Sequence, residues 1–419
     1  MKVLVIGGGG REHAVAKKLL ESDRVETVFC APGNAGIEAD GIQCVKVPET
    51  DSENLIAFAK AERIDFSIVG PEVPLLLGVV DDFEAAGLKA FGPRKEAALI
   101  EGSKDFAKSF MKKYQIETAA SKTFTDYDSA KAYLDEKGAP IVIKADGLAA
   151  GKGVAVAMSL EEATLALKEM MLEDKFGSAA EKVILEEFLE GEEFSLMAFV
   201  NGEEVYPMEI AQDHKRAYDG DKGPNTGGMG AYSPVPQISE QLVKKAVEEI
   251  LKPAARGLVA EGRAFRGVLY AGLIATNAGP KVIEFNARFG DPETQVVLPR
   301  LESDFAEVIQ KLLHDEKPDV RFKKSGVTLG IVLASAGYPD HYETGHELTG
   351  LEHLTETVRV YHAGTKWQDE VLVSAGGRIL LLETEADSMQ EARQALYDEM
   401  KKLDNPNFFY RIDIGSKAE

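Results

Sequence analysis

Apolar runs alternate with amphipathic helical patterns over the first 91 residues. The helical patterns fall at 12–21, 52–62 and 75–86, and the apolar runs are Val3–Ile6, Val25–Cys30, Ile42–Val47, Phe66–Val69 and Leu88–Phe91. Short apolar strands that alternate with helices predict an open parallel sheet covered on both faces. We therefore expect an N-terminal α/β domain over residues 1–101.

A different pattern follows Gly92-Pro93 and predicts an α+β region. Two short helices are expected over 94–113, and longer helices over 160–172 and 239–260. The stretch Asp213–Pro236 shows no period and is expected to be a long irregular segment. The predicted strands are Pro140–Ala145, Lys182–Glu187, Glu193–Val200, Gly267–Thr276 and Lys281–Asn286.

The last hundred residues again favour strands, with one helix near 387–402. Gly376-Gly377 is expected to be a two-residue turn. The predicted strands are Val327–Ser335, Glu356–Tyr361, Val371–Ala375 and Arg378–Glu383. The whole chain is therefore predicted to be a multidomain α/β and α+β protein. Its expected parts are 1–101, 102–324 with a lid subdomain at about 120–190, and a small α+β domain over 325–419.

Charge and composition narrow the range of functions that the sequence allows. The 419 residues include 48 Lys and Arg against 70 Asp and Glu, a net charge of −22. Such a surface argues against nucleic acid or an anionic membrane as the main partner. No apolar stretch reaches the roughly 20 residues of a membrane span. The two cysteines, Cys30 and Cys44, form no pairing motif, so we expect a cytoplasmic protein.

Glycine-rich turns follow the first two predicted strands, at Gly7–Gly10 and Gly33–Gly36. Such turns let backbone N–H groups approach a phosphate. A nicotinamide-binding site would need glycine where Glu12 stands and an acid at the end of the second strand. Both are missing, so Gly9, Gly33 and Asn34 are candidates for binding one phosphate or sugar phosphate. Tight turns without a ligand are the alternative.

Glu72 lies between Pro71 and Pro74, at the end of another predicted strand of the same sheet. Ligands of open α/β sheets bind at the carboxyl ends of the strands. Glu72 is therefore a candidate for receiving an amine or a sugar hydroxyl. The alternative is that it only begins the following helix.

Lys144 ends a predicted strand, and a glycine-rich segment leads from it to another strand. A phosphate-binding P-loop is excluded because Gly147 and Gly151 are one residue too close and Lys152 precedes Gly153 rather than Ser or Thr. The pattern instead predicts a flap between two antiparallel strands, able to close over phosphates.

The acid-rich segment 186–193 follows another apolar strand. Its backbone could read the edge of an adenine, and a carboxylate such as Glu193 could bind both ribose hydroxyls. A solvated turn is the alternative, since five of these eight residues are acidic.

Strand alternation places Glu284 and Asn286 on one face of the predicted strand Lys281–Asn286. Their oxygens suit Mg²⁺ or Mn²⁺ bound to nucleotide phosphates. Arg288 follows, and it could neutralise a phosphoryl group in transfer or hold a carboxylate.

The segment Gln212–Pro234 is assigned to substrate binding near Arg288. It carries Asp213, Lys215, Thr226 and a glycine cluster that includes Gly228. His214 has no visible partner, and we assign it no acid–base role.

This order of motifs resembles the ATP-grasp superfamily, and the whole set resembles its glycinamide ribonucleotide synthetase family. The motifs that carry the resemblance are Gly8–Ala14, Pro32–Gly36, Gly147–Gly153, Gln212–Arg216, Asn225–Pro234 and Glu284–Glu293. The resemblance implies an ATP-dependent ligase that joins glycine to 5-phosphoribosylamine through glycyl phosphate, in purine biosynthesis. It also implies a core of two α+β subdomains that hold ATP between them.

Roles for individual residues follow from the same resemblance. Lys104 and Lys144 would contact the ATP phosphates, Glu284 and Asn286 would bind Mg²⁺ or Mn²⁺, and Arg288 and Lys215 would be catalytic. The remaining ATP contacts would be Gly151, Lys152, Gly153, Glu186, Glu187, Phe188, Leu189 and Glu193. The substrate contacts would be Gly9, Gly33, Asn34, Glu72, Asp213, Thr226, Gly228, Asp291 and Pro292.

One position departs from the pattern of many relatives, which carry another metal-binding acid where Ala271 stands. A second metal would then rely on fewer protein ligands, on Glu293 or on another nearby acid. The resemblance also implies a monomer that binds neither nucleic acid nor membrane.

Three other functions fit parts of the sequence. A biotin carboxylase-like or purine carboxylase-like enzyme would share the nucleotide site but not Gly227–Gly230 or the Gly33–Gly36 turn. A nicotinamide oxidoreductase is opposed by Glu12. A nucleotide sensor without catalysis is opposed by the presence of Lys144 and Glu284.

Overall fold

Five parallel strands form the N-terminal sheet, in the order β3-β2-β1-β4-β5. The structure is a computed structural model that describes residues 1–147, 153–173 and 181–419. The strands are β1 (Lys2–Gly7), β2 (Thr27–Pro32), β3 (Gln43–Cys44), β4 (Phe66–Val69) and β5 (Ala90–Phe91), and the helices are α1 (Gly10–Leu20), α2 (Ala35–Ala39), α3 (Ser52–Glu62), α4 (Glu72–Leu77) and α5 (Val79–Ala85). The expected parallel sheet is confirmed. The helix expected over 75–86 is divided at Gly78, whose φ of 94° ends α4.

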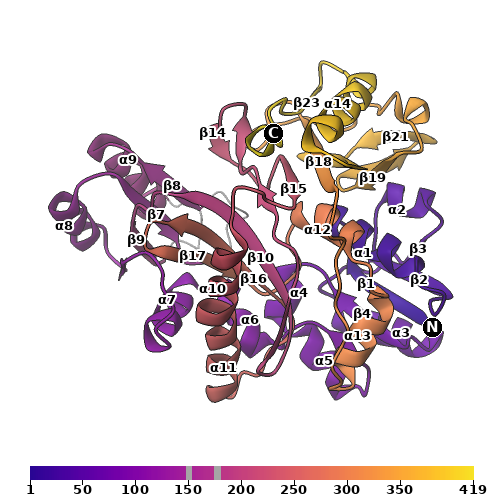
Figure 1. Cartoon of the computed structure of the whole chain (residues 1–419), viewed down its shortest axis with the longest axis horizontal. Helices are drawn as coiled ribbons and strands as arrows, with labels where there is room; N and C mark the ends of the chain where they lie inside the picture. Colours follow the sequence, from indigo (N-terminus) through magenta and orange to yellow (C-terminus); the bar gives the residue numbers. More distant parts are fainter. Residues whose placement is uncertain (148–152, 174–180) are drawn as a thin grey trace.

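A four-stranded sheet, in the order β6-β9-β7-β8, forms a separate layer with its own apolar core. Two helices precede it, α6 (Lys95–Gly102) and α7 (Lys104–Lys113). Its elements are β6 (Ser121–Phe124), α8 (Tyr127–Lys137), β7 (Ile141–Ala145), β8 (Val154–Ala157), α9 (Leu160–Met171) and β9 (Val183–Glu187). β7 and β8 pair in antiparallel fashion, as expected for the strands that flank the glycine-rich segment. This layer is the part of the molecule at the left of Figure 1.

The central antiparallel sheet has the order β11-β10-β16-β17. Its strands are β10 (Glu192–Asn201), β11 (Glu204–Pro207), β16 (Arg266–Thr276) and β17 (Gly279–Asn286), and one face is covered by α10 (Glu240–Ala246), a π-helical turn (Val247–Leu251) and α11 (Lys252–Ala260). β16 and β17 form the hairpin expected around 277–280, and their register sets Gly272 opposite Glu284.

The segment expected to be irregular, Asp213–Pro236, instead contains strands. They are β12 (Gln212–Asp213), β13 (Arg216–Tyr218), β14 (Lys222–Asn225) and β15 (Gly230–Ser233). Each has at most four residues and is interrupted by glycine or charge, so no alternation is visible in the sequence. β12 and β15 join the C-terminal sheet, in the order β12-β15-β18-β22-β19. The domain boundary expected at 325 stays a prediction, since this sheet unites strands from both sides of it.

The C-terminal sheet contains β18 (Val327–Ser335), β19 (Val358–His362) and β22 (Arg378–Ala386), with β23 (Phe408–Phe409) paired to β18. The helix α14 (Met389–Met400) packs against it. β20 (Thr365–Gln368) and β21 (Val371–Ser374) pair only with each other within the named strands, so Gly376-Gly377 leads from β21 into a different sheet. The expected two-residue turn therefore connects strands of two different sheets.

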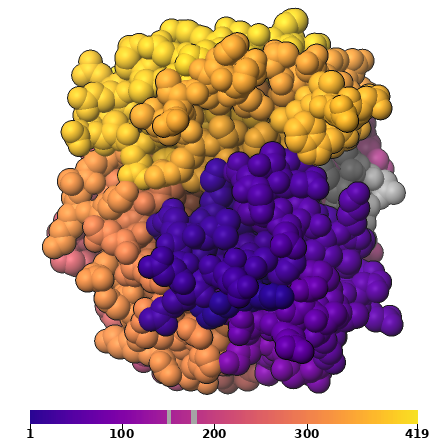
Figure 2. All heavy atoms as spheres, turned by 90° about the vertical axis from the view of Figure 1, so that its right-hand side faces the viewer, coloured from indigo at the N-terminus to yellow at the C-terminus, as the bar shows by residue number. Residues whose placement is uncertain are grey.

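The chain returns to the N-terminal domain after β17. The helix α12 (Glu293–Val297) contacts α1, and α13 (Phe305–Leu313) shares an apolar core with β1. Figure 2 shows the C-terminal residues lying directly over the N-terminal domain. Among the described residues, we find no helix with the length and apolar character needed to span a bilayer.

Candidate active site

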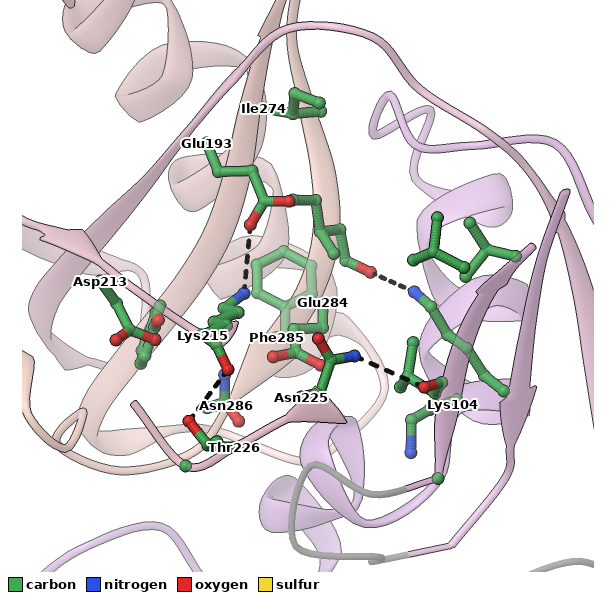
Figure 3. A pocket seen from close by; sticks show the side chains of 18 of the residues that line it. Lys104, Glu193, Asp213, Lys215, Asn225, Thr226, Ile274, Glu284, Phe285 and Asn286 are labelled. Carbon is green, nitrogen blue, oxygen red and sulfur yellow. Dashed lines mark hydrogen bonds and ion pairs between the residues drawn. The ribbon is translucent and has the colours of Figure 1, made fainter. Parts of the chain in front are cut away.

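The layer built on the sheet β6-β9-β7-β8 is called the lid layer below. A cavity of about 700 Å³ lies between the lid layer, the central sheet and the C-terminal sheet. Figure 3 shows side chains from these separate elements facing it, among them Lys104, Glu193, Lys215, Glu284 and Asn286. Residues that are distant in sequence therefore meet in one cleft.

Lys104 and Lys144 reach the cleft from α7 and β7. Ser103 caps α7 by accepting a hydrogen bond from the N–H of Phe106 (3.1 Å), which fixes the start of the helix next to Lys104. The Lys104 Nζ donates to the carbonyl of Gly147 (3.1 Å). The Lys144 Nζ donates to the carbonyl of Ile283 (3.1 Å), one residue before Glu284. The two lysines thus face the end of β17.

The carboxylate of Glu186 binds two lysines. Its Oε2 lies 2.9 Å from the Nζ of Lys144 and 3.2 Å from that of Lys108, and all three side chains are buried. Its other oxygen, Oε1, is buried and has no hydrogen-bond partner among the described residues. Burial lowers the pKa of Lys108 to about 8, although Glu186 opposes the shift. Lys108 was missed in the sequence, yet it follows Lys104 by one helical turn, which was an available signal.

The segment expected to read adenine also borders the cleft. Glu187, Phe188 and Leu189 line it beside Glu186. Apolar lining comes from Val142, Val156, Met111 and Ile274. Apolar side chains beside a backbone segment suit a purine ring. The adenine contacts stay a prediction, and the Glu186 side chain itself is held by lysines.

Glu284 and Asn286 both point into the cleft from β17, as strand alternation predicts. Burial opposes the charge of Glu284, but Lys215 and Lys144 outweigh burial and lower its pKa. Glu284 is therefore a carboxylate at neutral pH. The carboxylate oxygens of Glu284 are hard donors of the kind that suit a divalent metal ion.

Arg288 connects the central sheet to the N-terminal domain. Its guanidinium lies 3.2 Å from Glu72, 3.0 Å from Glu101 and 3.3 Å from the Oδ1 of Asn286. Burial disfavours its charge, but Glu101 and Glu72 overcome burial and raise the pKa of Arg288. Glu72 is thus brought to the cleft as expected. Glu101, the last residue before Gly102, was missed.

Lys215 lies among carboxylates on the opposite wall. Its Nζ is 3.4 Å from Glu193, the pair marked by a dashed line in Figure 3. Burial would lower the pKa of Lys215, but Glu193 and Glu284 raise it above its usual value. Burial and the nearby Glu293 raise the pKa of Asp213, whose Oδ1 has no hydrogen-bond partner in the part of the chain that the structure describes.

Glu293 is tied to the protein rather than free for a metal. Its carboxylate accepts hydrogen bonds from the Ser195 hydroxyl (3.0 Å) and from the Tyr270 hydroxyl. Ala271 belongs to the apolar core, whereas its neighbours Tyr270 and Gly272 line cavities. An acid at position 271 would therefore face away from the cleft.

Some predicted substrate residues lie behind the cleft rather than in its lining. The N–H of Gly9 donates to Glu12 (2.7 Å). The Asn34 amide donates to the carbonyls of Gly8 (2.9 Å) and His362 (2.8 Å), and a Cβ at Gly33 would overlap Cys44. Their phosphate-binding role stays a prediction, and so does the role of the other assigned residues.

The remaining predicted residues divide into three groups. Thr226, Asp291 and Gly153 line the cleft. Gly228 and Pro292 pack against each other just behind it, because a Cβ at Gly228 would overlap Pro292. Gly151 and Lys152 lie outside the described residues.

His214 borders the cleft but is neutral at physiological pH. Burial and the positive charge of Arg411 lower the pKa of His214 to about 4. Its Nδ1 accepts no hydrogen bond within the described structure. That His214 has no acid–base role stays a prediction.

The C-terminal domain contributes Tyr338, Arg378 and Lys417 to the lining. All three were missed, because no motif surrounds them. Only the sheet that unites β15 with β18 and β22 brings them to the cleft.

A nucleotide-sized cleft between two α+β layers, with lysines on one wall and a Glu-x-Asn strand on the other, defines an ATP-grasp ligase. Three models of the phosphoribosylglycinamide synthetase family match the chain: the N domain over 1–101, the ATP-grasp domain over 102–294 and the C domain over 328–417. The chain belongs to the family of phosphoribosylamine–glycine ligases.

Individual relatives agree with this membership. The phosphoribosylamine–glycine ligase of Listeria monocytogenes serotype 4b is 73% identical, with all of both chains covered. The crystal structure of the Thermotoga maritima phosphoribosylamine–glycine ligase has a TM-score of 0.86 at 35% identity and covers 99% of this chain and 100% of its own.

A more distant structure shows the shared fold alone. The biotin carboxylase domain of Hydrogenobacter thermophilus 2-oxoglutarate carboxylase, solved with MgADP, ADP and bicarbonate, has a TM-score of 0.70 at 16% identity. The match covers 98% of this chain and 91% of that one.

Proposed function

We propose that this chain joins glycine to 5-phosphoribosylamine at the expense of ATP and releases glycinamide ribonucleotide, ADP and phosphate, a step of purine biosynthesis. Family membership supports the overall reaction. The observation that carries the proposal is that Lys144 and Glu284 share one cleft, with the Lys144 Nζ bonded to the residue before Glu284.

The donors present fit a divalent cation such as Mg²⁺ or Mn²⁺. Glu284 supplies a charged carboxylate and Asn286 an amide oxygen, and such hard oxygen donors suit these ions. No cluster of three or more acid, His or Cys ligands occurs in the described ranges, so nucleotide phosphates would supply further ligands. When bound, the ion would neutralise charge on the phosphates of ATP.

The first chemical step needs placement rather than a protein nucleophile. A carboxylate oxygen of glycine attacks the γ-phosphorus of ATP, the bond to the ADP oxygen breaks, and glycyl phosphate forms. Lys104 and Lys144 stand where they can stabilise the phosphate oxygens. Arg288, fixed by Glu72 and Glu101, can stabilise the transferred group.

The second step consumes the acyl phosphate. The amine nitrogen of phosphoribosylamine attacks the acyl carbon, the bond to the phosphate oxygen breaks, and the nitrogen loses a proton. Lys215, held positive by its carboxylate neighbours, can stabilise the departing phosphate. Asp213 and Thr226 border the same part of the cleft and are proposed to bind substrate.

We further infer a cytoplasmic monomer. Two unpaired cysteines support a reducing compartment, and a net charge of −22 argues against nucleic acid or an anionic membrane as a partner. Sedimentation of the purified chain tests the monomer, and a dimer would contradict it.

The direct test supplies ATP, Mg²⁺, glycine and freshly made phosphoribosylamine and follows ADP and glycinamide ribonucleotide. The proposal expects both products, in equal amounts, only when all substrates are present. ADP formation that requires bicarbonate instead of glycine would indicate a carboxylase and would overturn the proposal.

A further inference from the structure

Arg378 is a partly buried arginine of the C-terminal domain that bridges two segments bordering the cleft. It begins β22, and its Nη1 donates to the carbonyls of Gly227 (2.7 Å) and Asp291 (3.1 Å). Its Nη2 lies 3.2 Å from the carboxylate of Asp291. The planar guanidinium thus joins the glycine cluster after β14 to the segment after β17.

A second C-terminal residue holds the same glycine. The N–H of Gly227 donates to the hydroxyl of Tyr338 (3.0 Å), while its carbonyl accepts from Arg378. A Cβ at Gly227 would lie 3.1 Å from the Arg378 guanidinium carbon, so this close approach favours glycine. Both backbone groups of Gly227 are therefore fixed by the C-terminal domain.

The fixed residues border the end of the cleft next to the N-terminal domain. Burial would raise the pKa of Asp291. The nearby positive charges of Arg378 and Arg11 outweigh burial and keep that pKa below its usual value. Arg11 in turn donates to the carbonyl of Phe289 (3.2 Å). Carboxylates beside arginines suit the hydroxyls and phosphate of a sugar phosphate.

We propose that Arg378, assisted by Tyr338, is a positioning residue for the phosphoribosylamine substrate. It acts by setting the distance between Gly227 and Asp291. It does not affect nucleotide binding at the other end of the cleft. This inference rests on the proposed ligase function, and it gives the C-terminal domain a defined part in substrate selection.

The test compares Arg378→Met, Arg378→Lys and Tyr338→Phe with the wild-type enzyme. Arg393→Met is the matched control, because Arg393 also belongs to the C-terminal domain but pairs with Glu419 (2.9 Å) and does not line the cleft. Calorimetry measures binding of glycinamide ribonucleotide and, separately, of ADP. Steady-state assays give KM for each substrate and kcat, and thermal unfolding checks the fold.

Arg378→Met should weaken glycinamide ribonucleotide binding roughly tenfold or more, since a charged and multiply bonded group is lost. KM for phosphoribosylamine should rise in parallel, while ADP affinity and KM for ATP stay unchanged. Tyr338→Phe should act in the same direction but more weakly. Arg378→Lys should recover only part of the affinity, because lysine cannot span both segments.

Two results would overturn the inference. One is unchanged glycinamide ribonucleotide affinity in a folded Arg378→Met enzyme. The other is an equal loss of ADP and glycinamide ribonucleotide binding, which would indicate a general structural role. If the Met variant does not fold, the Lys and Phe variants decide by the same criteria. A wild-type enzyme that makes no glycinamide ribonucleotide would instead contradict the proposed function.

Discussion

Opposite charges hold one another in place at the scale of single residues in this cleft. Glu284 remains ionised although buried, because Lys215, Lys144 and Lys104 surround it. Lys144 is in turn fixed by Glu186. Each side chain is therefore oriented before ATP arrives, which reduces the reorganisation that the reaction requires.

Removal of the Glu284 carboxylate should abolish turnover without unfolding the protein. Glu284→Ala removes the one carboxylate of the proposed metal pair, and we expect activity to fall at least ~100-fold. Mn²⁺ binding in the presence of a non-hydrolysable ATP analogue, followed by electron paramagnetic resonance, should weaken as well. Glu204→Ala, on the exposed edge of β11, is the control. Near-normal turnover of Glu284→Ala would contradict the assignment of Glu284 as a metal ligand.

A second residue-scale prediction concerns Glu383 of β22, which is fully buried. Burial raises the pKa of Glu383 to about 7, although Arg359 lies 2.9 Å away and opposes the shift. Because the folded pKa exceeds the unfolded value of 4.5, the folded state binds more protons between these values. The free energy of unfolding should therefore decrease as pH rises through this window.

Glu383→Gln removes that titration. The stability of the variant relative to wild type should increase between about pH 5 and about pH 8, by up to about 3 kcal/mol. Urea unfolding at both pH values measures it, with the exposed Glu356→Gln as control. A difference between wild type and Glu383→Gln that does not change with pH would contradict the buried, protonated carboxyl.

At the scale of secondary structure, single helices and strands fix the positions of the side chains that line the cleft. α7 carries Lys104 and Lys108, and its start is tied to the end of β7. Ser103 caps the helix and donates to Asp146 (3.1 Å), which also accepts from the N–H of Asp105 (2.8 Å). The cap therefore sets the distance between two parts of the wall that carries the lysines proposed to bind phosphate.

Ser103→Ala should lower stability by about 1 kcal/mol and raise KM for ATP, because the first turn of α7 loses its cap. Ser159→Ala removes an equivalent cap from α9, where Ser159 accepts from the N–H of Glu162 (3.2 Å), away from the cleft. Both variants should lose similar stability in thermal unfolding. Only Ser103→Ala should change KM for ATP, and an equal change in both would refute the positional role.

Helices and strands with a clear pattern of apolar residues could be predicted from the sequence, and those without such a pattern could not. β18 was expected at its observed bounds, Val327–Ser335, because nine successive residues are nearly all apolar or small. β12 and β15 were missed because they are short, because β15 pairs with β18 about a hundred positions later, and because β12 pairs in turn with β15. Such pairing depends on tertiary contacts that no local pattern contains.

The same distinction applies to the site. Glu284 and Asn286 follow from alternation on one strand, and Arg288 lies just beyond its end, so sequence alone brought them together. Arg378 and Tyr338 reach the cleft only through the shared C-terminal sheet, and nothing local marks them.

At the scale of the whole molecule, three parts of the chain together build the cleft. The N-terminal domain supplies Arg11 and Glu72, the lid layer and central sheet supply the lysines and Glu284, and the C-terminal domain supplies Arg378. The proposed function places ATP beside two further substrates in this cleft. Under that proposal, the oxygen that displaces ADP comes from glycine.

An isotope measurement tests that claim most directly. The enzyme is supplied with ATP, Mg²⁺, phosphoribosylamine and glycine whose carboxylate carries ¹⁸O, and the released phosphate is analysed by mass spectrometry. The account predicts that one ¹⁸O atom is transferred from glycine to each phosphate. Phosphate without ¹⁸O, released while glycinamide ribonucleotide forms, would contradict it.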